Sequence, residues 1–149
     1  MTTSNRYVLV QFILFAIFII ACIALPPSPA SVVKLVGLLA VVVGVGIFFA
    51  AIYTFRKETQ TLPNVTPDPK KNTNLVQSGI YGYIRHPIYT AVLVITLGII
   101  LYHGALGLFI VWAVLFVFFW LKADYEEGLL KAQFSDYVAY KRKTGKFWL

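Results

Sequence analysis

The residues best suited to chemistry lie between Leu75 and Tyr89, a stretch that reads LVQSGIYGYIRHPIY. It places three tyrosines, an arginine and a histidine directly before a long apolar segment. An arginine near the centre of a spanning helix costs about 3 kcal/mol to insert, so polar groups at the edge of a bilayer need a compensating role. This stretch is therefore the first candidate for a functional site.

Pro87 predicts the local backbone of the stretch. Proline removes a hydrogen bond inside a helix but fits its first position, so a helix is expected to begin at Pro87, after an extended or turn segment that ends in Arg85 and His86. The first N–H groups of such a helix are unpaired and carry the positive end of its dipole, which favours an anion there. The same residue types also suit an ordinary belt that anchors a spanning helix at the headgroups.

A second polar group, Asp124, Glu126 and Glu127, follows the last apolar run. Acidic residues in a first helical turn also complement the helix dipole, so alone they do not indicate a site. Together with the first stretch they predict a polar pocket that faces the cytoplasm. The single cysteine, Cys22, and the His/Glu spacing match no metal motif, so no metal is expected.

The elements that carry these groups are expected to be membrane helices. The 149 residues are only 13% charged, and their mean hydropathy is +0.77. We predict one all-α integral membrane domain over residues 1–149, with four transmembrane helices, the last two forming a tight hairpin, and a C-terminal amphipathic cytoplasmic helix. The predicted ranges are 7–25, 32–53, 87–102 and 104–121 for the spans, 55–86 for a cytoplasmic loop and 124–143 for the tail helix.

Two features of these helices predict their packing. Small residues recur at helical spacing in the second span, at Gly37, Ala40 and Gly44 with Gly46 nearby, which favours close helix contact. In the tail helix, Glu127 and Lys131 have the i,i+4 spacing of an ion pair.

The basic residues predict the orientation. Lys34 alone of the 13 Lys and Arg falls in a loop on the far side, so the positive-inside rule places both termini in the cytoplasm. The net charge of +7 sits beside apolar spans, which favours membrane lipids over nucleic acid as partners. We expect a multi-pass protein of a cell membrane, and its short, minimal form favours a prokaryotic one.

The motifs resemble the isoprenylcysteine carboxyl methyltransferase family and its relatives among phospholipid N-methyltransferases. The resemblance covers roughly residues 66 to 142. It consists of a Leu-Val, a Gly-x-Tyr, the Arg-His-Pro-x-Tyr, a Glu-Glu-x-x-Leu and a closing Tyr-x-x-Tyr, which occur here at Leu75-Val76, Gly79 to Tyr81, Arg85 to Tyr89, Glu126 to Leu130 and Tyr137 to Tyr140.

The resemblance implies an integral membrane methyltransferase that binds S-adenosylmethionine between the hairpin and the tail helix. The candidate catalytic residues are Arg85, His86 and Glu127. The residues expected to bind the cofactor are Thr73, Asn74, Leu75, Val76, Tyr81, His86, Pro87, Ile88, Tyr89 and Glu126.

The acceptor is expected to be lipophilic and to enter from the bilayer. Prenylcysteine enzymes carry an arginine, tied to the substrate, at the position of Lys122. Arginine binds a carboxylate through two parallel hydrogen bonds, and lysine does not. The lysine therefore argues against a prenylcysteine substrate. The alternatives are a phospholipid N-methyltransferase, a small-thiol S-methyltransferase, an NADPH-dependent reductase of the sterol type and a non-catalytic membrane scaffold.

Overall fold

A computed structural model describes residues 2–28, 31–69 and 74–148 of the chain. Within these ranges the chain is helical and forms no strand, which confirms the all-α prediction. The elements are α1 (Thr3–Ala24), α2 (Ser31–Thr59), the 3₁₀ helix η1 (Gly79–Gly82), α3 (Pro87–His103), α4 (Leu108–Gln133) and α5 (Tyr137–Lys143).

The chain is an integral membrane protein, because α1, α2 and α4 are long and apolar enough to cross a bilayer. Large apolar side chains point outward from these helices, among them Ile23 and Val32, which are 80% and 76% exposed. Helix α3 has 17 residues, about 26 Å at 1.5 Å per residue, against a hydrocarbon core of about 30 Å. The four-span arrangement therefore stays a prediction.

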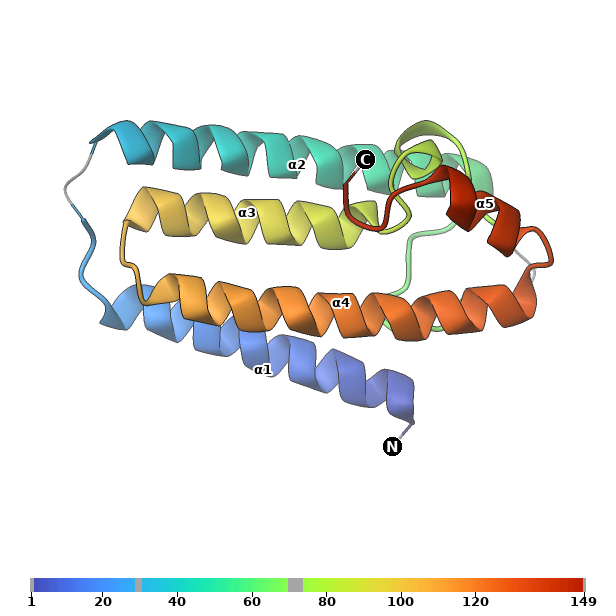
Figure 1. The fold of residues 1–149 in the computed structure, drawn as a ribbon, viewed down its shortest axis with the longest axis horizontal. Coiled ribbons are helices and arrows are strands. Elements are labelled where there is room, and N and C mark those ends of the chain that lie inside the picture. The colour runs from blue at the N-terminus through green and yellow to red at the C-terminus, as the bar shows by residue number, and fades with distance from the viewer. Residues whose placement is uncertain (1, 29–30, 70–73, 149) are drawn as a thin grey trace.

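Helices α1 to α4 lie side by side, with α3 between α2 and α4 (Figure 1). The turn between α3 and α4 lies at one end of this bundle, whereas η1, the beginning of α3 and α5 gather at the other (Figure 1). A buried apolar cluster from α1, α3 and α4 fills the space between these helices and includes Phe18, Leu93, Leu115 and Phe119. This core fixes the start of α3 against α4.

Helices α2 and α3 approach closely at their glycines. A Cβ atom on Gly37 would lie 2.6 Å from the carbonyl oxygen of Gly98 and 2.4 Å from the backbone nitrogen of Tyr102. A Cβ atom on Gly44 would lie 2.6 Å from the Ile95 side chain, whereas one on Gly46 would meet nothing within 4 Å. The predicted close packing is confirmed at Gly37 and Gly44, and it does not extend to Gly46.

The boundaries predicted for the fourth apolar helix are wrong, whereas the range predicted for the third, 87–102, agrees with α3 to within one residue. The fourth apolar helix was expected over 104–121, but residues 104–107 form the turn and α4 runs from Leu108 to Gln133. No helix-breaking residue stands where the apolar run ends, and Lys122 and Glu127 find buried partners, so α4 continues beyond it. The acidic group therefore lies inside α4 and not at the start of a separate tail helix.

The single tail helix predicted over 124–143 is also wrong. The backbone becomes extended at Phe134, with φ −118° and ψ 118°, and α5 begins only at Tyr137. The expected pair of Glu127 and Lys131 is replaced by one between Glu127 and Lys141 of α5, with 2.5 Å between Nζ and Oε2. The break lets the chain reverse and bring α5 back against α4.

Candidate functional site

Helix α3 begins at Pro87, as the sequence predicts, with His86 as its N-cap residue. The His86 carbonyl accepts a hydrogen bond from the backbone N–H of Thr90 at 3.0 Å. The N–H groups of Ile88 and Tyr89 make no hydrogen bond to any residue that the structure describes. The positive end of the α3 dipole and two free donors therefore point toward the space in front of the helix.

The 3₁₀ helix η1 forms one wall of that space. Gly79 begins η1 with φ +52°, a left-handed conformation that glycine adopts without strain. Tyr81 follows and is buried, and its carbonyl accepts a hydrogen bond from the Tyr140 hydroxyl at 2.7 Å. Burial raises the pKa of Tyr81 and of Tyr140, so both side chains stay neutral phenols at physiological pH.

The two neighbouring glutamates of α4 have different surroundings. Glu126 is partly exposed and accepts a hydrogen bond from the Tyr89 hydroxyl at 2.8 Å. Glu127 is buried and lies 2.9 Å from Arg85 Nε, 3.3 Å from His86 Nε2 and 2.5 Å from Lys141 Nζ. Glu127 therefore joins α3, α4 and α5, while Glu126 keeps a face toward solvent.

His86 is held between these two carboxylates. Its Nδ1 lies 3.6 Å from Glu126 Oε2, and its ring stacks on Tyr89 with 5.3 Å between centroids and 1° between planes. Burial lowers the pKa of His86, but the hydrogen bonds and charges of Glu126 and Glu127 together outweigh that effect and raise it. The geometry thus favours the protonated imidazolium.

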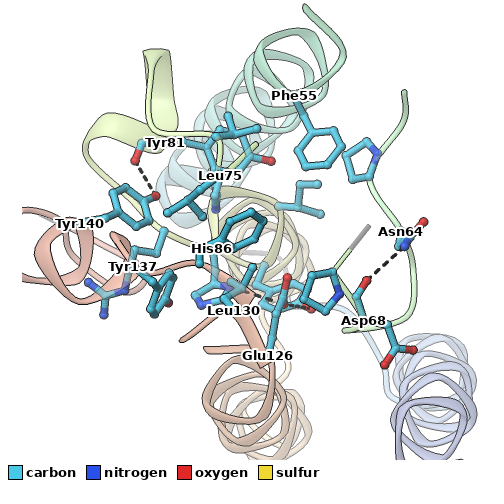
Figure 2. A pocket seen from close by; sticks show the side chains of 18 of the residues that line it. Phe55, Asn64, Asp68, Leu75, Tyr81, His86, Glu126, Leu130, Tyr137 and Tyr140 are labelled. Atoms are coloured by element: carbon cyan, nitrogen blue, oxygen red, sulfur yellow. Dashed lines mark hydrogen bonds and ion pairs between the residues drawn. The ribbon is translucent and has the colours of Figure 1, made fainter. Parts of the chain in front are cut away.

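These residues surround one cavity with an empty volume of about 880 Å³, part of it open to solvent. Figure 2 shows Phe55, Leu75 and Tyr81 on one side of it and His86 and Glu126 on another. Every described residue predicted to bind the cofactor lines this cavity: Asn74, Leu75, Val76, Tyr81, His86, Pro87, Ile88, Tyr89 and Glu126. Thr73 lies outside the described residues.

The three candidate catalytic residues do not all reach the cavity. Arg85 and His86 line it, whereas Glu127 lies behind them as their common ion-pair partner. The Arg85 guanidinium also donates to the backbone carbonyls of Lys141 and Thr144. The arginine is thereby tied to the C-terminal part of the chain.

Lys122 lies outside the cavity lining. Its side chain is buried, its Nζ donates to Gln11 Oε1 at 2.5 Å and to the Val65 carbonyl at 3.0 Å, and it lies 5.3 Å from the Tyr89 ring centroid. The residue therefore connects α4 to α1 and to the segment that follows α2. Its predicted role in substrate binding stays a prediction.

Sequence reasoning missed part of the lining. Residues on the segment after α2 close one side of the cavity: Pro63, Asn64, Thr66, Asp68 and Pro69. Asn64 donates to the Asp68 carbonyl at 3.1 Å (Figure 2), and Asp68 accepts from Ser4 of α1 at 2.5 Å. The prolines marked a loop, but nothing in the pattern indicated that it folds back over the site.

A comparison with protein families gives one match that covers most of the chain. The family model described as phospholipid methyltransferase matches residues 32–137, which include the cavity lining from α2 to the first turn of α5. No curated protein matches the chain. The matched range leaves out α1 and the residues from Val138 onward.

Proposed function

The chain belongs to the phospholipid methyltransferase family, and we propose that it is an integral membrane enzyme that uses S-adenosylmethionine to methylate a lipophilic acceptor. The observation that carries the proposal is that every described residue expected to bind the cofactor lines one cavity. The family match does not favour the reductase or the scaffold. It also gives no support to a prenylcysteine substrate.

The groups around the cavity suit S-adenosylmethionine. The free N–H groups of Ile88 and Tyr89 would hold its carboxylate, and the Glu126 carboxylate would accept hydrogen bonds from its ribose hydroxyls. The apolar and aromatic walls, which include Phe55 and Leu130, would receive the adenine. Bound there, the cofactor supplies an activated methyl group on its sulfonium.

The chain itself would contribute alignment and the exclusion of water. Methyl transfer needs the acceptor, the methyl group and the sulfur in line, so positioning carries most of the catalytic effect. Because both ring nitrogens of His86 face carboxylates, the residue is placed to serve as a donor and not as a general base. A carboxylate acceptor would need no base, whereas an amine or thiol acceptor would lose its proton to bound water or to another base.

The membrane setting favours an acceptor that reaches the cavity from the bilayer. The cavity lies among η1, α5 and the start of α3, at one end of the apolar helices (Figure 1). A lipid could therefore keep its chains in the hydrocarbon layer and present its headgroup at the cavity. We further propose four spans with both termini in the cytoplasm, because the basic residues concentrate on that side.

Calorimetric binding of S-adenosylhomocysteine to the detergent-purified protein tests the proposal, with NADPH titrated in parallel. We expect micromolar binding of S-adenosylhomocysteine, weakened about tenfold to a hundredfold in Glu126→Gln, because a hydrogen bond to a charged group contributes about 1.5–3 kcal/mol. Glu58→Gln is the matched control, since Glu58 lies outside the cavity lining. Binding of NADPH alone, or of neither ligand, would overturn the proposal.

The acceptor class is tested separately in vesicles. Transfer of a radiolabelled methyl group would be followed into phosphatidylethanolamine and into a farnesylcysteine derivative, each at the same mole fraction. We expect labelled product in the lipid fraction with at least one acceptor. Cofactor binding without transfer to any lipid-soluble acceptor would contradict this part of the proposal and leave the cofactor site standing.

A further inference from the structure

The segment 144–148, called here the strap, lies directly against the start of α3. The N–H of Arg85 donates to the Gly145 carbonyl at 2.9 Å, and the N–H of His86 donates to the Lys146 carbonyl at 3.2 Å. The N–H of Gly145 in turn donates to the Tyr83 carbonyl at 2.9 Å. The backbone that presents Arg85 and His86 is therefore hydrogen-bonded to residues about 60 positions later in the sequence.

The strap continues along α3 through Phe147. The Thr90 hydroxyl donates to the Phe147 carbonyl at 2.7 Å, and the Phe147 side chain is only 1% exposed. Its ring meets the His86 ring edge-on, with 6.2 Å between centroids, and also contacts Phe116 and Trp120. Phe147 thus closes one side of His86, whose Nδ1 and Nε2 approach the glutamates of α4.

Lys146 fastens the strap to α4. Its Nζ lies 2.6 Å from Asp124 Oδ1 and 4.1 Å from the Trp120 ring centroid, and it donates to the Trp120 carbonyl at 3.2 Å. The strap is therefore held by α3 on one side and by α4 on the other. It lies beyond the residues that the family model matches.

We propose that the strap positions the cofactor-binding end of α3, with Phe147 as the positioning residue that acts through His86. The inference rests on the proposed function, because it concerns the same cavity. Backbone bonds to Arg85 and His86 fix the direction of the α3 start, and the Phe147 ring keeps the His86 imidazole in its stack on Tyr89. Displacement of His86 would misalign the backbone N–H groups of Ile88 and Tyr89, which would hold the cofactor carboxylate.

Phe147→Ala tests the proposal by two measurements on the detergent-purified full chain. The first is the rate at which diethyl pyrocarbonate modifies His86, located by mass spectrometry, with His103 at the far end of α3 as internal reference. Because only the neutral imidazole reacts, the rates are compared at several alkaline pH values. We expect about a tenfold faster reaction at His86 with no change at His103, because the opening is local. The second is the dissociation constant of S-adenosylhomocysteine at low temperature, expected to rise about tenfold through misalignment.

Three further variants separate positioning from general destabilisation. Phe147→Leu, which keeps apolar volume beside His86, should restore both measurements to within about threefold. Trp148→Ala removes a neighbouring ring that is 58% exposed and stacks on Phe116, and should leave both unchanged. Thr90→Val removes the hydroxyl that donates to the Phe147 carbonyl and, at 3.2 Å, to the His86 carbonyl, with little change in volume. It replaces Phe147→Ala if that variant does not fold.

The outcomes distinguish the two proposals. If the wild-type protein binds no S-adenosylhomocysteine, the proposed function fails, and His86 modification still decides the role of the strap. If Phe147→Ala, or Thr90→Val in its place, leaves His86 as protected as in the wild type, the strap does not position it. Equal acceleration at His86 and His103 would likewise overturn the proposal, since it would indicate general loosening.

Discussion

Arg85 and Glu127 form a buried ion pair, with 2.9 Å between Nε and Oε1 and side chains that are 8% and 4% exposed. The same carboxylate also faces His86 and Lys141. One side chain of α4 therefore holds the beginning of α3 and the end of α5 together. This arrangement indicates that Glu127 acts by positioning its neighbours, whereas Glu126 faces the cavity.

Glu127→Gln should destabilise the protein strongly. The substitution leaves a buried arginine without its counter-charge, and breaking a buried pair in this way costs about 3–5 kcal/mol. Unfolding by denaturing detergent in mixed micelles measures the loss. Glu126→Gln is the control, because its side chain is 27% exposed and should lose less than about 1 kcal/mol. Equal stability of the two variants would refute the assignment of different roles.

The pH dependence of stability should carry a contribution from His86. Glu126 and Glu127 raise its pKa in the folded protein above the ordinary value of 6.5. The native state then binds more protons than the unfolded state, so this contribution is complete below pH 6.5 and is lost as pH rises through the raised pKa. Thermal midpoints of the wild type and His86→Asn, compared from pH 6 to pH 9, should converge toward alkaline pH. Parallel curves would show that His86 does not titrate in this window.

The local chemistry of the site could be predicted from the sequence because it depends on neighbours along the chain. Pro87 predicts where α3 begins, since its ring allows few other positions. Leu75, Val76, Tyr81 and the residues from Arg85 to Tyr89 line one cavity. The apolar runs predicted α1 and α2, although α1 begins before the range predicted for it and α2 ends after its own. These features need no knowledge of distant contacts.

The rest of the site depends on contacts between segments far apart in sequence. The length of α4 could not be predicted, because the partners that bury Lys122 and Glu127 lie on other elements. The position of the strap could not be predicted from the sequence. Gly145 indicates only that the preceding helix ends, and not that the chain then hydrogen-bonds to Arg85. The loop over the cavity is held through Asp68 by Ser4, which is 64 positions away.

Lys122→Met should loosen the segment that closes the cavity. The substitution keeps apolar length but leaves Gln11 Oε1 and the Val65 carbonyl without their donor, which costs about 1–3 kcal/mol. Hydrogen exchange at the backbone amides of Asn64, Val65, Thr66 and Asp68 should accelerate. The exposed Lys131→Met serves as control and should leave exchange unchanged. Unchanged exchange in Lys122→Met with weaker acceptor binding would instead favour direct contact between Lys122 and the substrate.

Gly37→Ala should separate α2 from α3. The added methyl group would lie 2.4 Å from the backbone nitrogen of Tyr102 and 2.6 Å from the Gly98 carbonyl oxygen. Because both contacts are backbone atoms of a packed helix, neither can move aside cheaply, and overpacking of this kind costs about 1–3 kcal/mol.

Gly46→Ala is the matched control for that prediction, since it makes the same change in the same helix where nothing lies within 4 Å. Alanine is the better helix former by about 1 kcal/mol, so this variant should be as stable as the wild type or more so. Detergent unfolding of both variants, together with calorimetric binding of S-adenosylhomocysteine, separates the packing effect from any effect on the site. If Gly37→Ala proves no less stable than Gly46→Ala, α2 and α3 do not pack at the close distance described.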